Sequence, residues 1–547
     1  MSLSKLCSQY PIYRKIVNNI SSLTDVNNLI YTSPSIYESI NGISVRKTFF
    51  VPNSNLVIEY EFHNDTNNLF DNFFVNHEKG PMRTDELLEY FKNSTEFIEH
   101  IKIISIDLYN MDRFCNEVQN YDSVIVESFL QKMAAFIDEL FDICPNADTL
   151  TFASSNNMEL FIIKYLKSPK IKALKELKNW SGYNYLRIPN VNFENIVNGL
   201  KELREIELVV GPFDSNIDIW FMWIFESMAK DVFKKKDSNI SIILNSGLEA
   251  QFSYIYNDII KKYNIQIALH HKKNNFSMIY EHSTSLSSMF PFKNVVELNF
   301  ILYNNEFFTK FFKMLPSFCN VKTIKILVKV EIFQNIKNIE NVVNNCVPPF
   351  DERLLKKLPN VEKMFIQIDD INEVEEEKLY LVINLGVEQI LKQLKDNLKV
   401  LYLGDVPRLS KKIRNILITN CPNLMDLYLH PILSIDINFV KRMKNLKFIG
   451  LKGFHNLNIP DNIELIIIYP NDSPGNEESI NVAQMNNIEC FRYLKEKLNR
   501  FFRISLRNSK NGFLNYIVLC NNVLHWSDYI EKSVVYDYLR FYDWFCV

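Results

Sequence analysis

Aliphatic residues recur along this chain in a short pattern that begins after an asparagine. The clearest copy starts at Asn423 and places Leu424, Leu427 and Leu429 at its three aliphatic positions. Similar copies start at Asn146, Asn294, Asn320, Asn360, Asn397, Asn445 and Asn462. The last two aliphatic positions are two residues apart, which predicts a strand with alternate side chains buried.

Between the copies, apolar residues follow helical spacing. Residues 123–141 are one such segment and lead to Asn146, and residues 373–395 precede Asn397. Successive copies from Val295 to Ile463 lie 17 to 40 residues apart. Several steps match a leucine-rich repeat of 20–29 residues, and longer steps leave room for insertions.

The copies resemble the leucine-rich-repeat family, especially its irregular form with Cys-Pro-Asn or Leu-Pro-Asn before the strand. The resemblance covers roughly residues 97–470 and is weak between 210 and 290, where Ile240–Asn245 and Ile265–His270 are poor copies. It implies an α/β solenoid with parallel strands on the concave side and helices outside. Chance triplets are the alternative in a chain that is 47% hydrophobic, but eight copies with asparagine at one offset argue against it.

The N-terminal segment, residues 1–42, predicts a small all-α module of three short helices. It resembles an F-box: Tyr10-Pro11 stands at the opening, and Asp25-Val26-x-x-Leu29 matches the middle. Tyr10 replaces the usual leucine, no Glu follows Pro11, and the late tryptophan is missing. The alternative is a helical cap, which a solenoid of this kind needs.

The F-box resemblance implies docking on the Skp-type adaptor of a cullin ubiquitin ligase, while the repeats hold a protein substrate. The implied adaptor-binding residues are Pro11, Ile16, Ile20, Leu23, Val26 and Leu29. Two rivals remain: a leucine-rich-repeat interaction scaffold without a ubiquitin link, and an enzyme whose site is assembled from distant residues.

The rest of the chain divides by composition. Residues 43–96 are expected to connect the module to the repeats and to cap their N-terminal end. Residues 97–470 form the predicted solenoid. Residues 471–547 begin with a polar linker and continue into a predicted C-terminal cap, with a helix over 481–502 and a strand over 513–520.

Charge and cysteine content narrow the function classes. A formal net charge of −3 gives no global attraction to nucleic acid or to an anionic membrane. The start of the chain lacks a signal-peptide core, and no apolar run approaches the ~20 residues that span a bilayer. Nine cysteines without a CxxC motif indicate free thiols, so we expect a cytoplasmic or nuclear protein.

The sequence also lacks the familiar catalytic and phosphate-binding motifs. Only 12 glycines are present, and no GxSxG, GxGxxG, P-loop or HExxH occurs. His270 and His271 are adjacent and point in different directions, which disfavours joint metal ligation. We therefore expect no catalytic residue, cofactor or metal, and a protein-binding role.

The position between the last two aliphatics of each repeat is expected to face the concave side. Phe365, Tyr402 and Tyr428 occupy it in successive strands, and Phe448 occupies the position two residues earlier. Exposed aromatics on a rigid scaffold suit a protein-binding hot spot. We therefore predict the substrate-binding face there, although aromatics also favour strands for structural reasons.

Overall fold

A computed structural model describes the chain over eighteen stretches of sequence. These are residues 55–61, 73–75, 83–93, 98, 101–109, 123–152, 158–179, 196–210, 219–245, 257–271, 292–336, 339–351, 361–369, 377–431, 437–452, 459–469, 503–508 and 514–520. The described residues fall into two compact units that meet in sequence at residues 296 and 297. Each unit is described by itself.

In the unit formed from residues 51–296, seven strands pair in parallel in the order of the sequence. They are β1 (Asn55–Glu61), β3 (Ile103–Tyr109), β4 (Thr149–Phe152), β5 (Ala173–Asn179), β6 (Glu205–Val210), β7 (Asn239–Asn245) and β8 (Gln266–His271). The helices between them are α6 (Thr84–Asn93), α9 (Ser123–Ile143), α10 (Met158–Ile163) and α11 (Ile219–Phe233). One helix between strands per repeat is the expected arrangement of a solenoid.

The second unit, whose described residues begin at Glu297, repeats the plan with seven more parallel strands, and the first of these starts two residues before that boundary. They are β9 (Val295–Leu302), β10 (Thr323–Lys329), β11 (Lys363–Asp369), β12 (Val400–Val406), β13 (Asp426–Pro431), β14 (Phe448–Lys452) and β15 (Leu465–Tyr469). The helices are α14 (Asn305–Met314), α15 (Glu331–Gln334), α16 (Ile339–Asn345), α18 (Glu377–Leu391) and α19 (Lys411–Asn420). Short 3-10 turns are η3 (Phe292–Asn294), η4 (Leu315–Ser317) and η6 (Ile437–Arg442).

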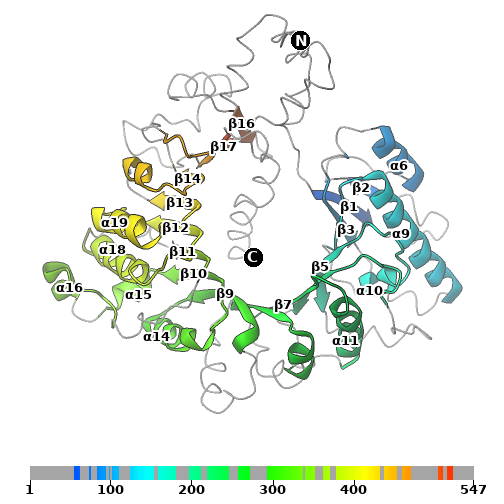
Figure 1. Ribbon diagram of the computed structural model, residues 1–547, viewed down its shortest axis with the longest axis horizontal. Coiled ribbons are helices and arrows are strands. Elements are labelled where there is room, and N and C mark those ends of the chain that lie inside the picture. The colour runs from blue at the N-terminus through cyan, green and yellow to red at the C-terminus, as the bar shows by residue number, and fades with distance from the viewer. Residues whose placement is uncertain are drawn as a thin grey trace, which may run out of the picture. The chain divides into compact units, whose positions relative to one another are not determined.

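Within each unit the helices lie along one side of the strands (Figure 1). In the second unit, α14 to α19 run beside β9 to β14, and in the first, α9 to α11 run beside β3 to β7. This is the α/β leucine-rich-repeat architecture that the spacing predicts, with parallel strands and helices on one face.

The leucines of the pattern form the core between strands and helices. Six of them in two consecutive repeats are at most 1% exposed: Leu398, Leu401, Leu403, Leu424, Leu427 and Leu429. Leu401 pairs with Leu427, and Leu403 with Leu429, in parallel register. The prediction of buried leucines in adjacent parallel strands is confirmed.

The recurring asparagine bonds the backbone of a neighbouring repeat. Asn445 Nδ2 donates to Pro422 O at 2.9 Å, and Asn423 Nδ2 donates to Asp396 O at 3.0 Å. Asn294 Nδ2 donates to Ile265 O at 3.0 Å in the first unit. Backbone carbonyls away from regular structure need partners, and the asparagine side chain supplies one in these repeats.

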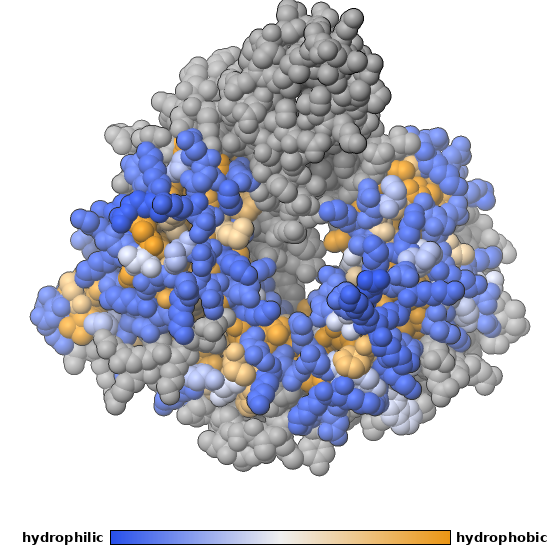
Figure 2. Space-filling view, in the orientation of Figure 1, coloured by the Kyte–Doolittle hydropathy of each residue, from blue (hydrophilic) through white to orange (hydrophobic). Residues whose placement is uncertain are grey.

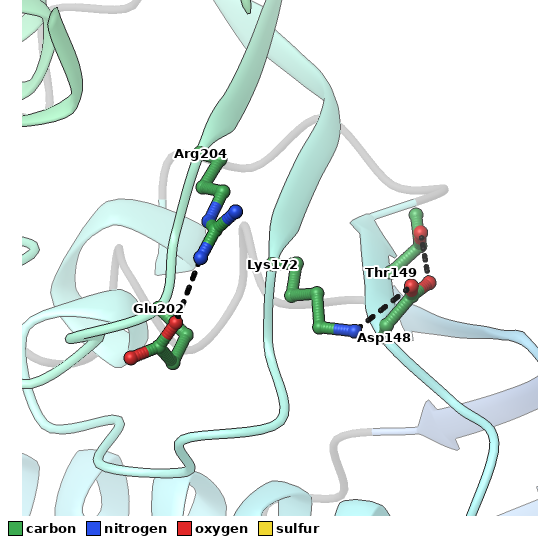
Figure 3. Close-up of polar contacts among 5 residues, drawn as sticks. All are labelled: Asp148, Thr149, Lys172, Glu202 and Arg204. Carbon is green, nitrogen blue, oxygen red and sulfur yellow. Dashed lines mark hydrogen bonds and ion pairs between the residues drawn. The ribbon is translucent and has the colours of Figure 1, made fainter. Parts of the chain in front are cut away.

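A second repeating contact lies just before each strand. Lys172 N donates to Asp148 O at 2.8 Å, and Arg204 N donates to Lys172 O at 2.8 Å. Side chains of opposite charge pair there (Figure 3): Lys172 Nζ lies 3.8 Å from Asp148 Oδ2, and Arg204 Nη2 lies 3.3 Å from Glu202 Oε2. The pairs are solvent-exposed, so they add little stability, and the backbone bonds fix the repeat spacing.

Each unit also contains antiparallel strands. In the first unit, β2 (Phe73–Val75) pairs antiparallel with β1. In the second unit, β17 (Leu514–Cys520) pairs antiparallel with β15 and with β16 (Arg503–Asn508). The strand predicted over 513–520 is therefore present, whereas the helix predicted over 481–502 lies outside the described residues.

The structure also places regular strands where the repeat pattern is weak. β7 and β8 cover the poor copies after Ile240 and Ile265, and both pair in parallel with their neighbours. β1 lies within residues 43–96 and pairs in parallel with β3. Parallel pairing therefore begins before the stretch in which the sequence pattern is clear.

Candidate protein-binding face

The predicted aromatic row occupies one register position across the strands of the second unit. Phe365 pairs with Tyr402, Tyr402 with Tyr428, and Tyr428 with Gly450. The rings of Phe365 and Tyr402 are 6.2 Å apart between centroids, and those of Tyr402 and Tyr428 are 6.3 Å apart. The sequence thus located these three side chains in one row, on the strand face opposite the leucines.

The prediction that this row is exposed is wrong. Tyr402 and Tyr428 are each 1% exposed, Phe365 is 4% exposed, and Phe448 is 7% exposed. One reason is visible in the glycines of the adjacent strand. The Tyr428 ring lies so close to Gly450 that a Cβ there would be 2.0 Å from Tyr428 Cδ1. The Tyr428 ring therefore lies along the sheet and covers the next strand instead of standing out from it.

Alternation in a strand assigns a side chain to a face, but it does not reveal whether solvent reaches that face. The aromatic residues therefore stabilise the sheet through cross-strand contacts, which are worth roughly 0.2–1 kcal/mol per pair. Their assignment as the substrate-binding residues remains a prediction, and it now requires that a partner reach side chains that this structure buries.

A polar network that sequence reasoning missed adjoins the row. Tyr402 OH donates to Gln367 Oε1 at 2.9 Å, and Gln367 Nε2 donates to Asp405 Oδ2. Asp405 has a φ of 48°, and the register between β12 and β13 shifts between Gly404 and Val406. The bulge turns the Asp405 carboxylate toward Gln367, and aspartate tolerates the left-handed backbone that this requires.

At the other end of the aromatic row, the register partner of Phe365 is a charged residue. Lys325 pairs with Phe365, and Lys325 Nζ lies 5.7 Å from the Phe365 ring centroid. Glu297 Oε1 lies 3.1 Å from the same nitrogen. A lysine over an aromatic face is a favourable cation–π contact. The row therefore runs from an ion pair through stacked aromatics to a glycine.

On the same strand face, the residues that solvent reaches lie two positions before the aromatic row along each strand. Lys363 is exposed, and Glu297, Thr323, Val400 and Asp426 are half-buried. These five residues are register partners on successive strands, and we call them the strand-start row. The row continues to Phe448, where it becomes buried. Its chemistry changes from strand to strand, while the residues of the opposite face are apolar and buried.

The view in Figure 2 is mostly hydrophilic over the described residues, with smaller hydrophobic areas between. Six large hydrophobic residues of the described part of the chain are exposed: Tyr90, Trp223, Phe233, Val347, Leu381 and Met425. None of them belongs to the strand-start row. A candidate binding face on these strands therefore consists mainly of charged and polar positions, with Val400 among them, and is not an apolar patch.

The predicted adaptor-binding residues all lie outside the described residues. They are Pro11, Ile16, Ile20, Leu23, Val26 and Leu29. The structure therefore provides no position for the predicted F-box-like helices.

Two cysteines and one histidine that could carry chemistry are buried. Burial raises the pKa of the Cys144 and Cys421 thiols to about 12, because a thiolate loses its hydration there. His270, on β8, is buried at 5% exposure. No group of three or more His, Cys, Asp or Glu residues suited to a metal is found in the described part of the chain.

Among the described helices, none combines the length and the low charge of a membrane-crossing segment.

The chain belongs to a family described as a domain of unknown function (DUF8346), whose model matches residues 47–532. The match begins after the F-box-like segment, residues 1–42, and includes every described strand.

Two individual proteins are also similar to this chain. Ribosomal RNA small subunit methyltransferase A from Mycoplasma mobile is 26% identical over 272 residues, which cover 47% of this chain and 96% of the methyltransferase. A solved internalin from Listeria monocytogenes has a TM-score of 0.23 and 10% identity, with 68% of this chain and 89% of the internalin covered. At that TM-score the likeness adds nothing to the fold, which rests on the repeats and the strand pairing.

Proposed function

We propose that this chain is a protein-interaction scaffold that binds its partner along the strand-start row of the second unit. The observation that carries the proposal is the contrast between the two faces of these strands. One face repeats buried apolar residues, mostly leucine and isoleucine, and the other presents Glu297, Lys363 and Asp426 at one register position. A constant core with a changing outer row suits recognition of an extended protein surface.

The spacing of that row supports the proposal. Neighbouring parallel strands lie ~4.8 Å apart, so the side chains of the row form a continuous line. Backbone bonds before each strand hold that line in place, as in Met425 N to Lys399 O at 2.8 Å. Because the scaffold is already ordered, binding loses little backbone entropy.

We also propose that the chain is not an enzyme. Doubly wound cofactor-binding sheets reverse their strand order at a switch point and carry helices on both faces. Here the parallel strands of each unit pair in sequence order, and helices lie on one side (Figure 1). The alternative is methyl transfer, by likeness to the methyltransferase of Mycoplasma mobile. Methylation of ribosomal RNA by the purified chain would favour that alternative.

The experiment that tests the scaffold reverses two charges of the row. Lys363→Glu with Asp426→Lys keeps the net charge and leaves the leucine core intact. We expect proteins that co-purify with the wild-type chain from its native cells to be lost, with the thermal midpoint unchanged. Charge reversal on the rim of an interface acts through misplaced like charges.

The matched control reverses two exposed charges beside the helices. Asp396→Lys with Lys411→Glu also keeps the net charge, and both residues are exposed. The control variant should retain the wild-type set of partners. If both double variants retain it equally, or lose it equally, the strand-start row is not the binding face.

A finer proposal concerns the N-terminal segment and rests on sequence alone. Asp25-Val26-x-x-Leu29 and Tyr10-Pro11 resemble an F-box, so the chain would be the substrate adaptor of a Skp-cullin-F-box ubiquitin ligase in the cytoplasm or nucleus. Ile20→Asp with Leu29→Asp should then abolish co-purification of a Skp-type adaptor and a cullin while the repeats stay folded. If neither the Skp-type adaptor nor the cullin co-purifies with the wild-type chain, the F-box proposal is wrong and the scaffold proposal without a ubiquitin link remains.

A further inference from the structure

Helix α11 carries apolar side chains on two faces. Its inner face buries Ile224, Phe225, Met228, Ala229 and Val232. On its outer face, Trp223 is 59% exposed and Phe233 is 46% exposed. A surface helix normally confines its apolar residues to the core side. The second apolar face of α11 is therefore unusual for a helix in contact with water.

The outer aromatics share their face with lysines. At ~100° per residue, Trp223, Glu226, Lys230 and Phe233 fall within a sector about 80° wide, and Lys234 follows directly after the helix. Lys230 and Lys234 are exposed. Trp223 and Phe233 are separated by ten positions, which corresponds to ~15 Å along the helix. The face is thus long enough to contact several turns of another chain.

A neighbouring helical segment, residues 257–263, extends this face. The Phe233 and Tyr263 rings meet edge to face with centroids 5.7 Å apart. Lys262 Nζ donates to Glu226 Oε1 at 2.9 Å and lies 4.9 Å from the Tyr263 centroid. These contacts join the two helices, so the exposed aromatics sit on a fixed platform. Preorganised aromatics lose little entropy when a partner covers them.

The charge of the platform is positive. Exposed lysines at 230, 234, 236, 261 and 262 lie on α11, just after it, and on residues 257–263. Exposed or half-buried carboxylates are fewer: Glu226, Asp231, Asp237 and Asp258. The whole chain, by contrast, has a formal net charge of −3. The positive excess is therefore local and coincides with the exposed aromatic residues.

We propose that this platform is a second interaction surface, which binds an acidic protein segment carrying large apolar side chains. The apolar side chains would cover Trp223 and Phe233, and carboxylates would pair with Lys230 and the lysines around it. Tryptophan is the residue type most enriched in binding hot spots, and its burial by the partner would supply most of the affinity. The lysines would supply orientation and on-rate.

The carboxylates within the platform favour a protein over a nucleic acid. Glu226 already pairs with Lys262, and Asp231 pairs with Lys234 at 3.0 Å. A phosphate backbone needs several cations in a line and would meet these two carboxylates. An acidic peptide can place its few carboxylates selectively beside the remaining lysines.

The platform is formed by α11 and residues 257–263 of the first unit. The strand-start row lies on the strands of the second unit. The two proposals therefore involve no common residue. Each can fail without the other, because the charge reversals at Lys363 and Asp426 leave α11 unchanged.

The test uses the full chain and three fluorescent probes. The first is a short amphipathic peptide with leucine and phenylalanine on one helical face and glutamate on the other. The second replaces every glutamate by lysine, and the third is a single-stranded oligothymidylate. Binding is measured by fluorescence anisotropy at low and high salt. We expect only the glutamate peptide to bind, and its affinity to fall as salt is added.

Variants assign the binding to this surface. Trp223→Ala should lower the affinity for the glutamate peptide by at least about ten-fold. Trp223→Phe should lower it less, because an aromatic ring remains. Lys230→Glu should also lower this affinity, although it leaves Trp223 and Phe233 in place. Tyr90→Ala, which removes an exposed aromatic from α6, is the matched control and should bind as the wild type does.

Four outcomes would overturn the proposal: no binding of the glutamate peptide, equal binding of the lysine peptide, binding that survives both Trp223→Ala and Lys230→Glu, or Trp223-dependent binding of the oligonucleotide. The last outcome would identify a nucleic-acid surface. Circular dichroism and the thermal midpoint show whether each variant is folded. Because Lys230 is exposed, Lys230→Glu tests the surface even if Trp223→Ala fails to fold.

Discussion

The aromatic ring of Tyr428 covers the backbone of Gly450 on the next parallel strand. The two residues are register partners, and a Cβ at position 450 would lie 2.0 Å from Tyr428 Cδ1 and 2.6 Å from Cε1. The end of the aromatic row thus depends on a residue without a side chain. Glycine weakens a strand in general, so its presence here indicates a need for close approach.

Gly450→Ala should therefore destabilise the chain by about 1–3 kcal/mol, the usual cost of overpacking a filled interior. Chemical denaturation monitored by circular dichroism measures the change. A double-mutant cycle with Tyr428→Ala provides the control, because the ring that causes the clash is then absent. If Gly450→Ala costs the same free energy in both backgrounds, the ring does not restrict position 450.

The relationship between Tyr428 and Gly450 also shows where sequence reasoning ends. The spacing of Leu424, Leu427 and Leu429 was enough to predict strand, register and buried face, because a strand alternates its side chains. The same alternation placed Tyr428 on the other face. Whether that face meets solvent depends on ring direction and on what covers it, and neither follows from spacing.

The repeat pattern did not predict strand β1 or the polar network around Tyr402, and each omission has a physical reason. Leu56 and Ile58 of β1 are register partners of Ile104 and Ile106, but the first aliphatic position of that copy is Asn53. A search for three aliphatics therefore misses the strand. The Tyr402–Gln367–Asp405 network depends on a left-handed backbone at Asp405, for which the dipeptide Gly404-Asp405 was the only signal.

The asparagine that recurs at one position of the repeats predicts a measurable stability effect. Asn445 Nδ2 bonds Pro422 O at 2.9 Å, so Asn445→Ala should cost about 1 kcal/mol, the net worth of one hydrogen bond. Urea denaturation measures the difference. Asn415→Ala, at an exposed position of α19, is the matched control and should be nearly neutral. Equal effects of the two substitutions would argue against a structural role for the repeat asparagine.

The leucine core predicts a larger effect at Leu427, which is fully buried. Leu427→Ala removes buried methyl groups and leaves a cavity between β13 and the helices, so we expect a loss of ~2–5 kcal/mol. Met425→Ala is the control two residues away, because Met425 is 43% exposed. Thermal unfolding should separate the two variants clearly, and similar midpoints would contradict the assigned burial.

The cysteines predict a pattern of chemical labelling. Burial raises the pKa of Cys144 and Cys421 to about 12, so hardly any thiolate forms near neutral pH. Cys319 and Cys346 are exposed. Iodoacetamide at mildly alkaline pH should label Cys319 and Cys346 in the native chain, and should label Cys144 and Cys421 only after denaturation. Peptide mass spectrometry reads out each site, and native labelling of Cys421 would contradict its burial.

The ion pair between Glu362 and Lys399 predicts a small dependence of stability on pH. Lys399 Nζ lies 2.8 Å from Glu362 Oε2, and this hydrogen bond lowers the pKa of the carboxyl below its ordinary value of 4.5. A carboxyl with a lowered pKa in the folded state stabilises the fold fully above its ordinary pKa. That contribution to stability is lost as the pH falls through the lowered pKa that Glu362 has in the folded state. The side chains are 36% and 55% exposed, so solvent screening limits the effect to less than about 1 kcal/mol.

Lys399→Met removes the cation and should return the Glu362 pKa toward 4.5, which carboxyl NMR titration measures directly. The unfolding free energy of this variant should fall less steeply than that of the wild type as the pH is lowered through the acid range. Lys412→Met, at the exposed start of α19, alters the net charge equally and serves as the control. It should leave both the Glu362 titration and the slope unchanged. A Glu362 pKa that responds equally to both substitutions would mean that general charge, rather than this contact, sets its value.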